Sequence, residues 1–186
     1  MARQVIDVSL ANSRARTGYR IDDELLLTAA YRSTAVLADP ADPERPQLDP
    51  EHEHPDGAPG TRLPHLRLAG PPGAASTLDL VGPGFTLFTA REDAGWQRQA
   101  DTATAARLPV TVHSLSAPGW SEASGLPAAT GALLVRPDGH IAWRSAQPPT
   151  GDGQLLAALR RVLSAEQGAV RTAQVPFAGR FGSRAS

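Results

Sequence analysis

The amino-acid sequence predicts an α/β fold, and three observations support this prediction. A turn sequence, Pro137-Asp138-Gly139, separates two short apolar runs, as it does in a β-hairpin. Two segments with helical periodicity, residues 93–107 and 153–166, alternate with short strand-like runs. A strand, a helix and a second strand precede the hairpin, which is the order of a parallel βαβ unit.

The hairpin is expected over residues 131–143. Pro137 fixes its own φ, Asp138 can accept a hydrogen bond from the backbone two residues on, and Gly139 tolerates a positive φ. An apolar run at 133–135 precedes the turn, and apolar and polar residues alternate after it, as in a half-buried strand. A hairpin needs a sheet to join, so the other strands are expected to supply one.

The first 38 residues are expected to form an N-terminal arm. Residues 3–17 carry a short apolar stripe typical of a helix, which ends at Gly18. Asp22 can cap a short turn before three leucines, and residues 31–37 are strand-like. An arm of this length cannot form a core alone, so it must pack on the following domain, a second copy or another chain. A homodimer is the simplest of these solutions.

Residues 39–59 are an acidic, proline-rich segment without periodicity, which predicts a loop. His52 and His54, flanked by Glu51 and Glu53, are candidate metal ligands. We prefer a solvated loop without a metal, because histidines at i and i+2 share a face only in an extended chain. Nothing in the sequence orients their rings.

Regular patterning begins at Gly60. A short strand is expected around Leu66 and Leu68, where apolar residues alternate with polar ones. Residues 76–81 form a second short element, which Gly82-Pro83-Gly84 closes.

A buried strand is predicted at 85–89 and another at 110–115, with a helix at 93–107 between them. Asp93 is the expected cap of this helix. Its apolar face consists of Trp96, Ala100, Ala103 and Ala106 or Arg107. The following loop, 117–130, has room for one turn of helix.

The helix at 153–166 has a strong apolar side, formed by Leu155, Leu156, Leu159, Val162 and Leu163. Arg160 and Arg161 lie on its other side, and residues 167–186 are expected to be a flexible tail. The order strand, helix, strand, loop, hairpin, helix predicts a thioredoxin-like domain over residues 60–166. The chain has no cysteine, so such a domain cannot perform dithiol exchange.

Composition excludes several classes of protein. The absence of cysteine removes disulfides, thiolate catalysis and cysteine metal sites. A net charge of −1 gives no electrostatic case for nucleic acid or an acidic membrane. The apolar runs are far shorter than the roughly 18 residues of a membrane span, and the N-terminus has no secretory h-region. These features predict a cytoplasmic protein.

Four segments together resemble the C-terminal region of FAD-dependent aromatic hydroxylases, which include phenol hydroxylases and polyketide tailoring oxygenases. The segments are 31–36, 60–66, 76–87 and 133–144. The resemblance covers about residues 1–165 and implies a thioredoxin-like fold without redox cysteines. It also implies a setting in aromatic polyketide tailoring and a flavoprotein partner.

The chain departs from that family in lacking a Gly-x-Gly-x-x-Gly turn after any strand, the motif that holds the FAD pyrophosphate. Its nearest glycine cluster, Gly82-Pro83-Gly84, precedes a strand, and Pro83 removes an N–H donor. The resemblance therefore implies the trailing domain of a hydroxylase without its FAD-binding domain. No cofactor and no metal are expected, and no catalytic or cofactor-binding residue carries over.

Several residues are weighed as candidates for chemistry. His65 is expected to bond a backbone group, and Asp79 to cap or bond the adjacent turn. His113, Ser114 and Asp138 could form a triad, a combination that any chain of this size offers.

The tryptophans and one arginine are the remaining candidates. Trp96, Trp120 and Trp143 could line an aromatic pocket, although the first and third fall on expected core faces. Arg144 is a candidate anion ligand.

Two function classes remain. The first is a noncatalytic stabilising or interaction module with a well-packed body and no deep pocket, whose partner is a flavoprotein or a second copy. The second is a small cofactor-free cyclase or isomerase acting on an aromatic polyketide, which predicts a concave site of several hundred Å³ with convergent polar groups. We prefer the first, so catalysis by the chain alone is not expected.

Overall fold

The computed structural model describes residues 29–39, 42–43, 56–69, 74–90, 94–127 and 130–172, with side chains as far as Ser164. Several features expected from the sequence lie outside these residues. They are the helix at 3–17, the turn at Asp22, most of the loop at 39–59 with the histidines at 52 and 54, the Asp93 cap, and the tail beyond residue 172.

A four-stranded sheet forms the centre of the described part. The strands are β1 (Phe85–Thr89), β2 (Val110–Ser114), β3 (Ala132–Val135) and β4 (Ile141–Ser145), in the spatial order β2-β1-β3-β4. β1 and β2 are parallel and connected by helix α3 (Ala94–Ala105), whereas β3 is antiparallel to both β1 and β4. The expected βαβ unit and hairpin are thus confirmed.

The turn of the hairpin has the geometry that its sequence predicts. The N–H of Gly139 donates to the Arg136 carbonyl over 3.0 Å, and Gly139 has a φ of 80°. The backbone N–H of His140 donates to Oδ1 of Asp138 over 3.1 Å. The Asp138 side chain therefore holds the backbone two residues on, as expected.

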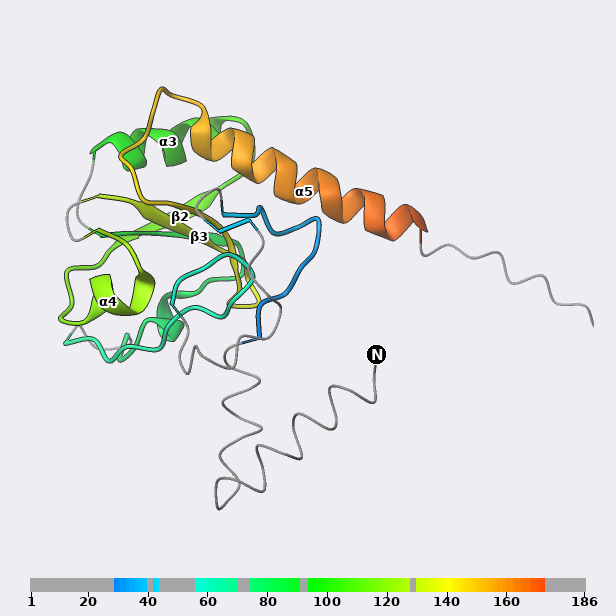
Figure 1. The fold of residues 1–186 in the computed structure, drawn as a ribbon. Helices are drawn as coiled ribbons and strands as arrows, with labels where there is room; N and C mark the ends of the chain where they lie inside the picture. The colour runs from blue at the N-terminus through cyan, green and yellow to red at the C-terminus, as the bar shows by residue number, and fades with distance from the viewer. Residues whose placement is uncertain are drawn as a thin grey trace, which may run out of the picture.

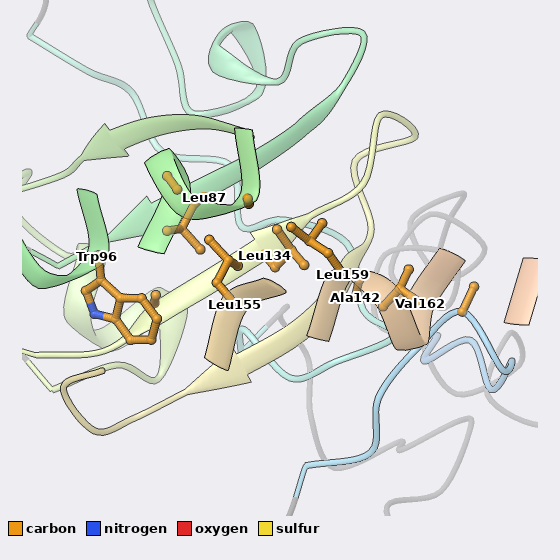
Figure 2. Close-up of a cluster of buried hydrophobic side chains, with 11 residues drawn as sticks. Leu87, Trp96, Leu134, Ala142, Leu155, Leu159 and Val162 are labelled. Carbon is orange, nitrogen blue, oxygen red and sulfur yellow. The ribbon is translucent and has the colours of Figure 1, made fainter. Parts of the chain in front are cut away.

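Helices α3 and α5 (Gln154–Thr172) cover one face of the sheet, as Figure 1 shows. Figure 2 shows the core beneath them, a cluster of apolar side chains from both helices and the sheet. Its labelled members are Leu87, Trp96, Leu134, Ala142, Leu155, Leu159 and Val162.

The opposite face is covered by shorter pieces. They are the 3₁₀ helix η1 (Leu78–Leu80), helix α4 (Trp120–Ser124) and the irregular segment 56–69. Beneath them lies a second core, made of Leu63, Phe88, Leu115, Trp120, Leu126, Leu133, Val135 and Ile141. Helix α4 lies in the predicted loop at 117–130, for which one turn of helix was expected.

Two expected strands are absent from the described residues, and each has a physical reason. The predicted strand at 31–37 is wrong, because the chain turns at residues 33–36, where the Ser33 hydroxyl accepts from the N–H of Ala35 over 3.2 Å. The region of Leu66 and Leu68 contains only a single bridge, Arg67 to Ser76. The paired segment, which contains Ser76, enters η1 two residues later, so the bridge does not extend into a β-ladder.

The end of α5 also differs from the expectation. The helix continues to Thr172, six residues past the predicted end at Glu166, so the backbone of the expected tail begins as helix. The apolar side was predicted correctly: Leu155, Leu159 and Val162 are buried, whereas Arg160 and Arg161 are exposed.

The arrangement is thioredoxin-like: a βαβ unit, an antiparallel hairpin and a closing helix. Among the described residues, none of the helices combines the length and hydrophobicity that a transmembrane segment requires.

Candidate functional site

An open groove of about 870 Å³ lies on the face that η1 and α4 cover. The segment 62–66 forms one wall, and η1, α4 and the hairpin turn provide the others. Leu63, Leu66, Leu78 and Val81 give the groove an apolar lining. Its volume falls in the range of small-molecule sites, but it is open rather than enclosed.

Hydrogen bonds to the turn and to η1 hold the segment 62–66 in place. The N–H of Leu63 donates to the Gly139 carbonyl over 2.8 Å, next to a bridge between Arg62 and His140. The Thr77 hydroxyl donates to the Pro64 carbonyl over 2.6 Å and accepts from the N–H of Leu66 over 3.1 Å. One buried threonine thus joins two stretches that make no extended ladder.

Asp79 has the role expected from the sequence. Its Oδ2 accepts from the N–H of Ser76 over 2.8 Å and from the Ser76 hydroxyl over 3.0 Å. This pair closes the turn from which η1 begins. Asp79 is therefore a structural residue, and it fixes the position of Leu78 beside the groove.

Charged side chains surround the apolar lining. Asp56, Glu122 and Asp138 contribute carboxylates, and Arg62 and His65 contribute basic groups. His65 is exposed here, and the backbone bond expected of it is not among the hydrogen bonds of the described residues.

The charge of Asp138 is set by its neighbours. Burial raises the pKa of this carboxyl, but the backbone N–H of His140 and the Arg136 guanidinium outweigh burial and bring the pKa below its usual range. Arg136 donates to Asp138 over 2.9 Å. The carboxylate is therefore committed to the turn, which leaves it poorly suited to abstract a proton.

His140 is a residue whose role the sequence did not indicate beyond its place after the turn. Its side chain is 12% exposed and meets the Tyr31 ring edge to face, with 4.8 Å between ring centroids. Its Nδ1 lies 3.4 Å from Oδ1 of Asp138, and neither ring nitrogen has a hydrogen-bond partner among the described residues. The alternation of apolar and polar residues after the turn predicted that His140 lies on the sheet, but it did not indicate the contact with Tyr31.

The structure does not bring the candidate triad together. His113 lies opposite Phe88 in the sheet, and Phe88 lies opposite Leu133. These residues are at the end of the sheet away from the hairpin turn, which contains Asp138. Ser114 shares a hydrogen bond of 3.0 Å with Thr89. Burial lowers the pKa of His113, although a bond to the Leu80 carbonyl opposes that shift.

The three tryptophans also lie apart. Trp96 and Trp143 meet edge to face at 5.8 Å within the core under α3 and α5. Trp120 contacts Phe88 at 5.8 Å in the other core. They belong to two cores on opposite faces of the sheet and do not line one pocket.

Arg144 does hold an anion, but the anion belongs to the chain itself. Its guanidinium forms an ion pair with the Asp39 carboxylate, and the two side chains are 18% and 11% exposed. The N–H of Leu37 donates to the Ala142 carbonyl over 2.8 Å nearby. The sequence predicted the type of ligand but gave no sign of Asp39, which lies 105 residues away.

Neither a metal nor a flavin site is evident within the described ranges. No group of three or more potential metal ligands gathers among these residues. At Gly82-Pro83-Gly84, a Cβ built on Gly82 would meet nothing within 4 Å, so this glycine does not serve a close backbone approach. Its N–H already donates to the Thr86 hydroxyl over 3.4 Å, and these residues do not fit a dinucleotide.

The chain is similar in sequence to a known protein family and to several characterised enzymes. A family model described as aromatic-ring hydroxylase, C-terminal, matches residues 56–165. Aklavinone 12-hydroxylase RdmE of Streptomyces purpurascens is 39% identical over 151 residues, which are 75% of this chain and 27% of that protein. Tetracenomycin A2 monooxygenase-dioxygenase of Streptomyces glaucescens is 33% identical, over 82% of this chain and 26% of that protein.

A solved structure of an aromatic hydroxylase also matches the fold of this chain. A ternary complex of aklavinone-11 hydroxylase with FAD and aklavinone matches with a TM-score of 0.65 and 36% identity. The match covers 80% of this chain and 28% of that one. The chain spans about a quarter of the length of these relatives. The family match extends over the whole sheet, α3, α4 and the first part of α5, so the chain belongs to the family of aromatic-ring hydroxylase C-terminal domains.

Proposed function

We propose that this chain is a noncatalytic module that packs against the flavin-bearing part of an aromatic hydroxylase and stabilises it, in the tailoring of aromatic polyketides. One observation carries the proposal: the family match covers the complete sheet, α3, α4 and the first part of α5, whereas the chain aligns with only about a quarter of each relative. In those relatives the domain is joined to a much larger part of the enzyme. The domain can stabilise that part without having an active site of its own.

The chemistry of the described residues supports this role. Asp79, Asp138 and Arg144 are each engaged by the fold, in a turn, a hairpin and an ion pair. Hydroxylation of an aromatic ring by oxygen needs a flavin, a metal or a comparable cofactor. FAD would supply oxygen activation in the flavin-bearing part, and residues of this domain would contribute packing.

A chimeric enzyme tests the proposal. Residues 29–172 would replace the C-terminal domain of aklavinone 12-hydroxylase, a relative 39% identical to this chain. We expect the chimera to purify with stoichiometric FAD and to unfold in one cooperative transition, because the two parts pack together. Loss of FAD, or independent unfolding of the two parts, would overturn the proposal.

The groove favours a second candidate, a cofactor-free cyclase or isomerase. Its 870 Å³ volume and the charged groups His65, Glu122 and Asp56 resemble the concave site such an enzyme requires. His65 would be its proton-transfer group. This candidate predicts saturable turnover of an aromatic polyketide by the chain alone without FAD, lost in His65→Gln. Absence of turnover by the unmodified chain rejects it.

A further inference from the structure

The two exposed large apolar side chains of the described residues lie around one corner of the domain. Leu78 is 46% exposed and lies at the groove, and Tyr31 is 61% exposed and packs on His140, directly after the groove-lining hairpin turn. Isolated exposed apolar residues need no explanation, but an exposed leucine within an apolar groove, with an exposed tyrosine just past the hairpin turn, marks a surface that a partner protein can cover.

The path of the chain indicates which partner protein covers this surface. The described chain begins at residue 29, and two residues later the N–H of Tyr31 donates to the Gly60 carbonyl over 2.8 Å. The chain then continues from Gly60 to Arg62 and Leu63, where the groove begins. The polypeptide that precedes this domain therefore joins it at the corner that carries Tyr31, His140 and the groove.

In the relatives, the segment that precedes this corner is the bulk of a hydroxylase. The family model describes a C-terminal domain, and the chain spans 27% of aklavinone 12-hydroxylase. A covalent connection at this corner brings the remainder of the enzyme next to the groove at high effective concentration.

Other surfaces of the domain are less suited to such a contact. The outward side of α5 carries Arg160 and Arg161, and both are exposed. The outer edge of β4 is already covered, because its backbone bonds with Leu37, Gly60 and Thr61. Figure 1 shows η1 and α4 on the side of the sheet away from α3 and α5, so the groove faces away from the helical layer.

We propose that the groove bounded by residues 62–66, η1, α4 and the hairpin turn is the surface that docks the flavin-bearing part of an aromatic-ring hydroxylase. The partner inserts an apolar ridge between Leu66, Leu78 and Val81, and Tyr31 extends the contact past the turn. This inference rests on the proposed function and adds to it the surface that performs it.

The test uses point variants of the chimeric enzyme, with flavin fluorescence to follow the rate of FAD release. Leu78→Glu places a charge in the docked groove, and we expect it to speed FAD release by roughly tenfold or more, as for an interface hot spot. Tyr31→Glu is a second variant with the same expected direction. Ala157→Glu is the matched control, an exposed apolar residue on α5 that should leave the rate unchanged.

The same substitutions in the 186-residue chain separate docking from folding. Leu78 is half exposed, so Leu78→Glu should leave the urea midpoint of the chain close to its original value. A chimera that holds FAD equally well with and without Leu78→Glu and Tyr31→Glu would overturn the docking surface and leave the proposed function standing. A chimera that holds no FAD even with the unmodified domain would overturn both.

Discussion

Gln99 connects the two long helices, and replacing it tests how the helical layer is held. Its side chain is 2% exposed. The amide oxygen accepts from the N–H of Leu155 over 3.1 Å, and the amide nitrogen donates to the Gly151 carbonyl. A side chain of α3 thus satisfies one of the free N–H groups at the start of α5.

Gln99→Met keeps the length and helix propensity of the side chain but removes both hydrogen bonds. Leu155 is fully buried, so its N–H would be left unsatisfied at a cost of about 1–3 kcal/mol. Gly151 is exposed, so water can replace the bond to its carbonyl. The added apolar burial of methionine offsets part of the loss, and the expected fall in unfolding free energy is about 1–2.5 kcal/mol.

Urea denaturation followed by tryptophan fluorescence, to which buried Trp96 contributes, measures this change. The matched control is Gln97→Met, on the same helix, which loses only an exposed bond of 3.1 Å to Asp101 and should change stability by less than about 0.5 kcal/mol. If Gln99→Met and Gln97→Met shift the midpoint equally, Gln99 does not connect the helices in the way described.

Three further predictions concern the turn, its carboxylate and the N-terminal arm. Gly139→Val should lower the unfolding free energy by about 1–3 kcal/mol, because its φ of 80° strains a β-branched residue even though the site is open; an unchanged urea midpoint would contradict this. The pKa of Asp138 is lowered in the fold, so the stability it contributes is present above its unfolded pKa of 3.8 and lost as pH falls through the lower folded pKa. The stability advantage over Asp138→Asn should therefore disappear in acid, and an advantage constant between pH 6 and about pH 2 would show that the carboxylate charge does not matter. Finally, the full chain should sediment as a dimer and a chain that starts at Ala29 as a monomer; if both are monomers, residues 1–28 do not mediate dimerisation.

The regular elements could be predicted because their signals are local. Alternation around Pro137-Asp138-Gly139 and the apolar stripe of α5 each depend on residues close in sequence. The strand β1 agrees with the prediction at both ends, since a run of buried residues bounded by turns leaves little choice.

The contacts between distant segments could not be predicted, because no local pattern encodes them. Nothing near Arg144 indicates Asp39, and nothing near Gln99 indicates the start of α5. The turn at 31–37 was missed for a related reason: its β-forming composition was outweighed by the Ser33 hydroxyl, which bonds the N–H of Ala35.

The two faces of the sheet are closed by different means, and this difference explains where the groove lies. Two long helices cover one face over the core that holds Trp96 and Leu155, and the hollow on that side lies only at the edge, between α5 and residues 34–38. The other face is closed by short pieces that side chains such as Thr77 and Asp79 fasten to the backbone. Irregular segments held in this way leave an apolar surface partly open while the core beneath stays complete, as the full burial of Phe88 shows. This is the face on which the domain can accept a partner without disturbing its own stability.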